Sequence, residues 1–224
     1  MQSLYLLADS QLLFWNSPSG AFLASVLKST GRDAPRIAYI GASNGDSPDA
    51  FSILKAAVER LPIGGLRVVS ASFPAEDQQF LQTADVVVLS GGDVETGWNV
   101  FTRTGLYENI VSRYRDGAVL VGVSAGAVQL GMHAAVPAEG GSSRLVETFG
   151  FVPLIVEVHD ERGDWKALSD TIHLLEGTAR GVGIPSGGGL IVHPDGTLEP
   201  VRRQVEEFSF RDGNLRRAVL FPPA

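Results

Sequence analysis

The sequence predicts an α/β fold in which a mostly parallel sheet is flanked by helices and followed by an antiparallel C-terminal meander. Three observations support this prediction. Apolar runs bounded by turn residues alternate with longer helical patterns, as in parallel sheets covered on both faces. Two runs, DVVVL at 85–89 and AVLVGV at 118–123, are continuously apolar, which is typical of strands buried on both faces. Short strands separated by tight turns follow near the C-terminal end.

The first half of the chain contains five predicted strands and the helices between them. The strands cover residues 4–7, 36–40, 66–70, 85–89 and 118–123. The spacing of apolar residues predicts helices at 20–27, 48–61, 75–83 and 100–115. Pro48 suits the start of its helix, because the N–H that proline lacks has no partner in the first turn of any helix.

The second half is less regular. Residues 154–158 form a predicted strand that leads to His159, residues 138–143 a predicted loop, and 171–175 fit neither type clearly. Strands at 189–193, 198–201 and 215–221 form the predicted meander, with turns at 194–196 and 212–214. No internal repeat, low-complexity tract or linker divides the sequence. We therefore expect a single domain over residues 1–224.

The composition excludes several classes of function. The 224 residues have a formal net charge of −7 and scattered basic residues, which argues against a nucleic-acid partner. No apolar run approaches the roughly 20 residues that span a bilayer, and the N-terminal segment resembles a first strand rather than a signal peptide. The chain contains no cysteine, which excludes thiolate chemistry and fits a reducing compartment. We expect a cytoplasmic protein with no membrane partner, and the sequence leaves a homodimer open.

No motif for a metal or cofactor is found. The sequence has no HExxH pair of the kind that binds zinc, and no GxxxxGK[ST] loop of the kind that cradles phosphates. The chemistry is therefore expected to come from side chains alone, without a metal or other cofactor.

A serine between glycines is the strongest functional signal. The segment Gly122-Val123-Ser124-Ala125-Gly126-Ala127 follows the buried run 118–123 and opens a helical pattern. A nucleophile on such a strand-to-helix turn needs small neighbours at positions −2 and +2, because side chains there would clash. Its hydroxyl then projects at the carboxyl edge of the sheet, beside the free N–H groups of a helix start. The alternative is a turn that only permits close packing of helix and strand.

The second signal is the segment Ser90-Gly91-Gly92-Asp93, directly after the other buried run. Two glycines at a strand end let backbone N–H groups face a ligand without interference from side chains. We expect this turn to lie near Ser124, with the Gly92 and Ala125 N–H groups as donors to an oxyanion. An ordinary strand-end turn is the alternative.

A serine nucleophile needs a general base, and histidine serves best near neutral pH. Of the four histidines, His159 ends a predicted strand and leads into a polar loop, so it is the best candidate. His133 follows Ser124 too closely in sequence, and His173 and His193 fall in segments expected to be surface or partly buried.

Together, the segments LSGGD at 89–93, GVSAGA at 122–127, PLIVEVH at 153–159 and GIPSG at 183–187 resemble peptidase family S51. This family contains aspartyl dipeptidase (peptidase E) and the cyanophycinases, and the resemblance covers most of the chain. It implies a class I glutamine amidotransferase-like fold and a serine peptidase that cleaves small peptides next to aspartyl residues. By this resemblance, Ser124 is the nucleophile, His159 the base and Gly92 an oxyanion donor.

The chain departs from the family at one position. Where peptidase E-like proteins have Pro-Glu-Gly, this sequence has Pro185-Ser186-Gly187, so the carboxylate that would orient the histidine is missing. Another acid then completes a triad, or the site operates as a Ser–His dyad. Glu157 is the first candidate, because it lies two residues before His159 on the same predicted strand face, and Glu139 is the second.

Substrate contacts are harder to predict. Arg162 follows the expected base and would attract an acidic substrate end, or it faces water. Asp93 would hold a substrate amine, or it caps the helical turn that follows. Two other functions stay open. One is an esterase of the GxSxG type, although no HGGG motif occurs and the histidine comes early. The other is a non-catalytic binding protein that has lost its acid.

Overall fold

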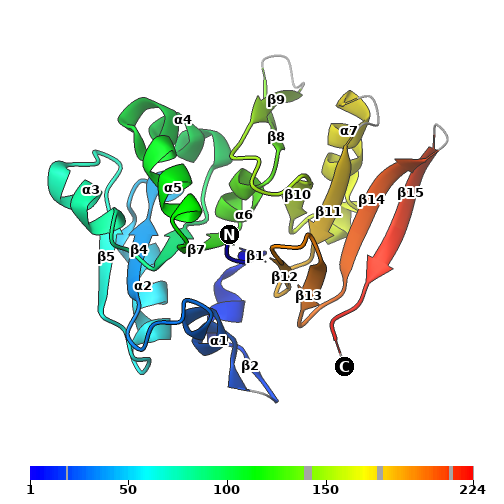
Figure 1. Ribbon diagram of the computed structural model, residues 1–224. Helices are drawn as coiled ribbons and strands as arrows, with labels where there is room; N and C mark the ends of the chain where they lie inside the picture. Colours follow the sequence, from blue (N-terminus) through cyan, green and yellow to red (C-terminus); the bar gives the residue numbers. More distant parts are fainter. Residues whose placement is uncertain (19, 139–142, 176–178, 212–213, 224) are drawn as a thin grey trace.

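The computed structural model has the predicted α/β architecture (Figure 1). It describes residues 1–223 apart from 19, 139–142, 176–178 and 212–213. The large sheet has seven strands, five of them parallel neighbours, with an antiparallel hairpin at one side. In spatial order its strands are β13 (Leu198–Val201), β12 (Gly189–Val192), β1 (Leu4–Leu7), β7 (Val119–Val123), β6 (Val86–Leu89), β4 (Arg36–Ile40) and β5 (Gly65–Val69).

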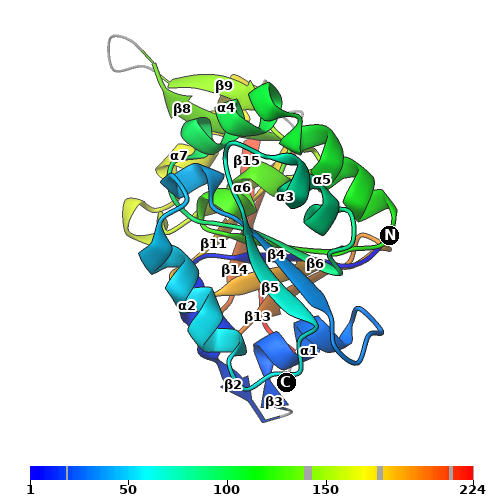
Figure 2. The ribbon, with the colours of Figure 1, turned by 90° about the vertical axis from the view of Figure 1, so that its left-hand side faces the viewer.

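Helices cover both faces of this sheet (Figure 2). One face carries α1 (Phe22–Lys28) and α2 (Pro48–Val58), and the other carries α3 (Ala75–Leu81), α4 (Val94–Thr104), α5 (Leu106–Arg115) and α6 (Ala125–Leu130). Strand β6 shows why its sequence is continuously apolar. Val86 and Val88 pack toward the α1–α2 side, while Val87 and Leu89 pack toward the other. Alternate residues of a strand point to opposite faces, so a strand covered on both faces has no polar side.

The predicted helix over residues 100–115 is wrong in its bounds. The structure has two helices, α4 and α5, and α4 begins already at Val94. Gly105 separates them with a φ of 81°, a left-handed conformation that ends α4 and that glycine adopts without steric cost.

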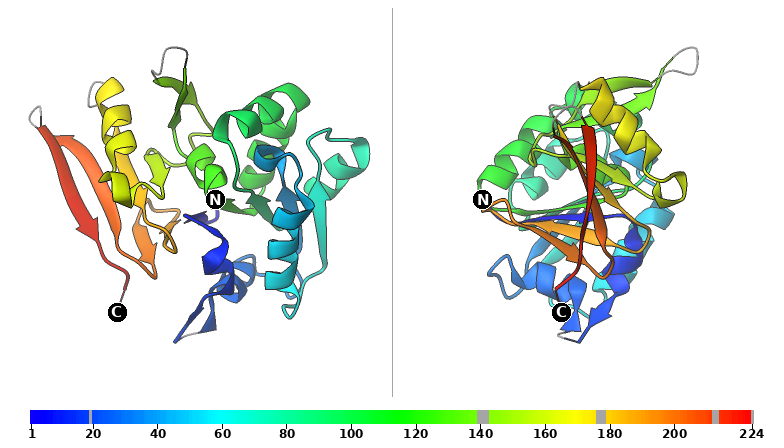
Figure 3. Two further views of the ribbon diagram at one scale, coloured as in Figure 1. Left: turned by 180° about the vertical axis from the view of Figure 1, so that it is seen from behind. Right: turned by 90° about the vertical axis from the view of Figure 1, so that its right-hand side faces the viewer.

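A second sheet lies at the end of the molecule opposite β5 (Figure 3). Its strands, in order, are β10 (Ile155–Val158), β11 (Arg180–Ile184), β14 (Val205–Arg211) and β15 (Asn214–Leu220), and α7 (Lys166–Leu174) packs against β10 and β11. The predicted meander is therefore split. Its first two strands are β12 and β13 of the large sheet, and its last strand belongs to the second sheet as β15.

Short elements complete the fold. Small antiparallel pairs join β2 (Asn16–Ser17) to β3 (Gly20–Ala21) and β8 (His133–Pro137) to β9 (Ser143–Glu147). In the part of the chain that the structure describes, 3-10 turns occur at η1 (Ser10–Phe14), η2 (Ala42–Asn44) and η4 (Glu161–Gly163). Within the described residues, no helix has the length and apolar character needed to cross a membrane.

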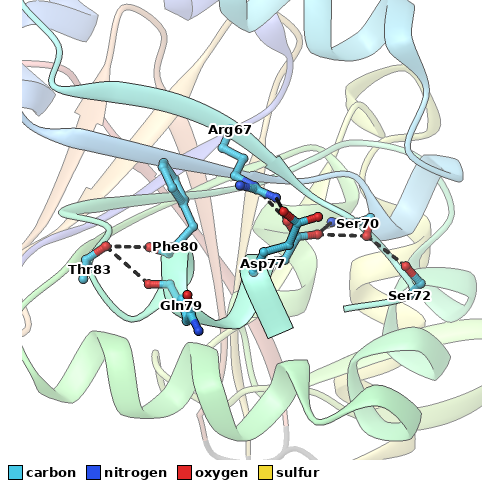
Figure 4. A network of polar contacts seen from close by, with 8 residues as sticks. Arg67, Ser70, Ser72, Asp77, Gln79, Phe80 and Thr83 are labelled. Carbon is cyan, nitrogen blue, oxygen red and sulfur yellow. Dashed lines mark hydrogen bonds and ion pairs between the residues drawn. The ribbon is translucent and has the colours of Figure 1, made fainter. Parts of the chain in front are cut away.

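A buried carboxylate fastens the edge strand β5 to α3 (Figure 4). Asp77 is buried, and it accepts hydrogen bonds from Arg67 Nε at 2.8 Å and from the backbone N–H and hydroxyl of Ser70, both at 2.9 Å. A buried charge is costly unless it is paired and hydrogen-bonded, and this one has both kinds of partner. The contact fixes the far edge of the sheet that carries the site.

Candidate active site

Ser124 occupies the predicted turn between β7 and α6, where φ is 51° and ψ is −113°. A positive φ is strained for a serine, and such strain is typical of residues held in place for function. The turn is tight. A Cβ at Gly122 would lie 2.5 Å from the Gly126 carbonyl oxygen, and a Cβ at Gly126 would overlap the backbone of Leu89. Both flanking glycines are therefore needed by close backbone approach, as the sequence predicts.

The Gly91–Gly92 turn lies beside Ser124, as expected. A Cβ placed on Gly91 would be 3.3 Å from the Cβ of Ser124. Gly92 has a φ of 139°, and a side chain there would overlap the Ser43 carbonyl. The N–H groups of Gly92 and Ala125 donate no hydrogen bond to any other described residue. Two unpaired donors thus flank the nucleophile, an arrangement that suits an oxyanion.

His159 reaches the same place from the second sheet. It follows β10 with a φ of 63°, and its N–H donates to the Ile184 carbonyl at 3.2 Å. His159 and Ser124 line one cavity of about 400 Å³, the size of a small-ligand site. The other lining residues are Asp9, Ser10, Leu13, Tyr39, Asn44, Ala50, Ile53, Leu54, Val88, Ser90, Gly91, Gly92 and Val123.

The other three histidines lie elsewhere. His193 is paired with Glu199 at 2.7 Å, and His173 packs edge-on against Phe210. His133 lies in the β8–β9 hairpin, and its Nδ1 has no partner among the described residues. None of the three lines the cavity with Ser124.

The His159 ring is hydrogen-bonded to Ser186, with Nδ1 and Oγ 3.4 Å apart. The expected acid, Glu157, is joined to a different group, because its Oε1 accepts the Val158 N–H at 3.1 Å. Burial raises the pKa of Glu157 to about 7. The second candidate, Glu139, lies outside the described residues. The structure thus places the Ser186 hydroxyl beside the His159 ring, where the family resemblance implies a carboxylate.

The family model of peptidase family S51 matches residues 21–198, which include Ser124, His159 and Ser186. The chain belongs to peptidase family S51. The family match indicates a peptidase, and it agrees with the resemblance to family S51 seen in the sequence motifs.

Solved structures agree with the fold of the S51 chain. A peptidase from an acI-B1 Actinobacterium is 19% identical, with a TM-score of 0.70 over 100% of this chain and 96% of that one. A protein named as a peptidase E, from Listeria monocytogenes EGD-e, is 16% identical, with a TM-score of 0.66 over 90% of this chain and 98% of that one. The comparison with curated proteins finds no match.

Neither expected substrate contact of the S51 chain lines the cavity. Asp93 is the N-cap of α4, and its carboxylate accepts the Thr96 N–H at 2.7 Å. Hydrogen bonds from the Thr96 side chain and backbone lower the pKa of Asp93, so the capping role is the one the structure displays. Arg162 lies on the exposed η4 turn.

Sequence analysis missed two cavity residues of the S51 chain. Asn44 donates to the Gly91 carbonyl at 3.0 Å and to the Tyr39 hydroxyl at 3.2 Å, and so holds the glycine turn. Asp9 accepts the Gly187 N–H at 2.6 Å, and so holds the loop that carries Ser186. Asp9 follows β1, which neighbours β7, and Asn44 follows β4, which neighbours β6. Ligands of open α/β sheets bind at the carboxyl ends of the strands, and a search of those strand ends would have found both residues.

Proposed function

We propose that this S51 chain hydrolyses small peptides through an acyl-enzyme, with Ser124 as nucleophile and His159 as base. The observation that carries the proposal is the shared cavity, where the strained Ser124 turn, the Gly92 amide and the His159 ring meet from three different strand ends. Three groups with complementary roles at one cavity are the expected signature of acyl transfer.

The reaction has two stages. The Ser124 hydroxyl attacks the peptide carbonyl while His159 takes its proton, and the negative oxygen of the intermediate accepts hydrogen bonds from the Gly92 and Ala125 N–H groups. Collapse breaks the C–N bond, and His159 returns the proton to the leaving amine. Water then attacks the ester by the same route, which releases the acid and restores Ser124.

The ring nitrogens of His159 have different tasks in this scheme. Nδ1 faces the Ser186 hydroxyl, which leaves Nε2 to act on Ser124. The Ser124 hydroxyl and the ring are not hydrogen-bonded to each other in the described structure. Catalytic hydrogen bonds often form or shorten only when substrate binds, so we expect the bond between Ser124 and His159 to form in the substrate complex.

The cavity also bears on substrate preference. Its lining includes the apolar side chains of Leu13, Ile53 and Leu54. Among the described residues that line it, Asp9 is the one carboxylate and there is no lysine or arginine. The family resemblance implies aspartyl substrates, but an acidic side chain needs a cation to offset its desolvation. The lining favours a neutral, apolar residue with a free amino group. Aspartyl peptides remain the alternative that the family implies.

A dipeptide panel tests both the proposed mechanism and the proposed substrate preference. The panel holds one leaving residue fixed and varies the first residue among Leu, Ala, Asp and β-linked Asp, with the Ser124→Ala variant as control. We expect turnover by the wild-type chain, highest for Leu, and a loss of about 10³-fold or more in the variant. Equal rates in the two proteins would refute the nucleophile. A higher kcat/KM for either Asp substrate would overturn the apolar preference while leaving the chemistry intact.

The same panel, extended by a Leu ester and by calorimetry, separates the two other functions. An esterase would hydrolyse a Leu ester but not the Leu dipeptide. A binding protein would bind the dipeptide in calorimetry with no turnover, and Ser186 at the carboxylate position is the feature that favours it.

A further inference from the structure

Ser186 lies in contact with both the His159 ring and the Glu161 carboxylate, the first through its hydroxyl and the second through its backbone. The His159 ring meets the Ser186 hydroxyl at 3.4 Å, and Glu161 Oε1 accepts the Ser186 N–H at 3.2 Å. Glu161 opens the η4 turn just after His159, and Ser186 follows β11. Strands β10 and β11 are parallel neighbours, so their carboxyl ends bring the two loops together.

The other nearby carboxylates are committed elsewhere. Asp160 accepts the Ala167 N–H at 3.1 Å and so supports the start of α7. Asp164 is paired with Arg217 at 2.6 Å. Glu157 bonds its own strand neighbour, as described above. Among these acids next to His159 in the described structure, Glu161 is the one that is hydrogen-bonded to Ser186.

We propose that Glu161 is the positioning carboxylate of this site and acts on His159 through the Ser186 hydroxyl. The hydroxyl accepts the Nδ1–H of the ring and gives its own hydrogen to Glu161. A neutral serine alone offers only an ordinary hydrogen bond, whereas a hydroxyl bonded to a carboxylate is polarised and stabilises positive charge on the ring better. The chain therefore replaces a direct His–carboxylate contact with a relay. This inference rests on the proposed function.

The charge of Glu161 is consistent with this role. Burial raises the pKa of Glu161, but the hydrogen bonds from the Ser186 side chain and from the backbone, together with the charge of His159, outweigh burial and lower it. Glu161 is thus ionised at neutral pH. The other charged groups around it are Asp160 on its own segment and Arg203 and Glu206 in the adjoining cavity.

The test compares Glu161→Gln, Ser186→Ala and the double variant, with Asp164→Asn as a matched control on the same turn. Asparagine tolerates the left-handed conformation of Asp164, so the control keeps the turn. Two measurements are made: kcat and KM on the best dipeptide, and the pH midpoint of the His159 ring proton by NMR. The NMR measurement does not depend on turnover, so it reports on the relay even if the peptidase proposal fails.

We expect Glu161→Gln to lower kcat about tenfold with KM within about twofold, a smaller loss than the 10⁴ caused by altering a direct triad carboxylate. The His159 midpoint should move to lower pH by roughly 0.5, because a negative charge that favours the imidazolium has gone. In the Ser186→Ala background the same change should have no further effect, and Asp164→Asn should resemble wild type.

Either of two results would overturn the relay. The first is a Glu161→Gln variant with the wild-type kcat and midpoint. The second is a midpoint shift of the same size with and without Ser186, which would mean that Glu161 acts directly across space. A shift in the midpoint without any turnover in wild type would uphold the relay and refute the peptidase proposal.

Discussion

Replacing Glu157 by glutamine should make the protein more stable at alkaline pH. Glu157 is partly buried on β10, and its carboxylate accepts a hydrogen bond from the neighbouring Val158 N–H. Burial raises its pKa from 4.5 to about 7. A pKa difference of that size between the unfolded and folded chain corresponds to at most about 3 kcal/mol.

The sign follows from which state binds the proton more tightly. Because the folded pKa is the higher one, the stabilising contribution of the proton is complete below pH 4.5 and is lost as the pH rises through 7. Above pH 7 the folded protein must keep a charged carboxylate in a poorly solvated place. Glutamine has a similar shape and carries no charge, so it avoids this cost.

Urea unfolding of wild type and Glu157→Gln at pH values from 4 to 8.5 measures the effect. The two proteins should be nearly equal at pH 4, and the variant should be more stable at pH 8.5 by up to about 3 kcal/mol with an unchanged m-value. Glu161→Gln is the matched control, for which the expected change in stability at pH 8.5 has the opposite sign. The pKa of Glu161 is lowered on folding, so this variant should be less stable than wild type at pH 8.5 and equal to it well below pH 4. A pH-independent difference for Glu157→Gln would refute the assignment of a buried, weakly paired carboxylate.

Three further results are expected. Gly126→Ala should lower stability by about 3 kcal/mol or more in thermal melts, because its Cβ would overlap the Leu89 backbone. The control Gly65→Ala should stay within about 1 kcal/mol of wild type, because its Cβ would meet only a side chain, at 3.8 Å. Equal melts for the two variants would contradict the tight turn. Asp93→Ala should cost about 1 kcal/mol of stability through the lost helix cap and leave kcat unchanged, and a large loss of turnover would return Asp93 to the substrate site. His159→Ala should keep the fold by circular dichroism but lose at least about 10³-fold in kcat, and a retained rate would move the base elsewhere.

The parts of the fold that depend on local pattern could be predicted from the sequence. The continuous apolar runs at β6 and β7 identify the buried centre of the sheet, because strands covered on both faces have no polar side. The second sheet was harder. Strand β14 contains two adjacent glutamates and β15 two adjacent arginines, so both have a weaker strand signal than the central runs. Which strand pairs with which is a tertiary property, and for this reason the meander was assigned as one unit.

In the candidate site too, some features could be predicted from the sequence pattern and others depend on how the strands pair. The glycines beside Ser124 and at positions 91 and 92 are visible in the sequence, because the close approach of Leu89 and Ser43 leaves no room for a side chain at Gly126 or Gly92. The partner of His159 depends on the parallel pairing of β10 with β11, which places Ser186 and Glu161 in contact. Glu157 was expected on the histidine's face of the strand, but the strand ends before His159, whose positive φ changes the direction of the chain. Alternation along a strand holds only while the strand continues.

Labelling with a fluorophosphonate tests the central claim most directly, because the reagent reacts with a serine only when a base and an oxyanion site activate it. Intact mass and peptide mapping after incubation give the number of labels and their position. We expect one label for each chain, on Ser124, which is absent in Ser124→Ala and formed much more slowly in His159→Ala. An unlabelled folded protein, or a label that persists in Ser124→Ala, would contradict the account.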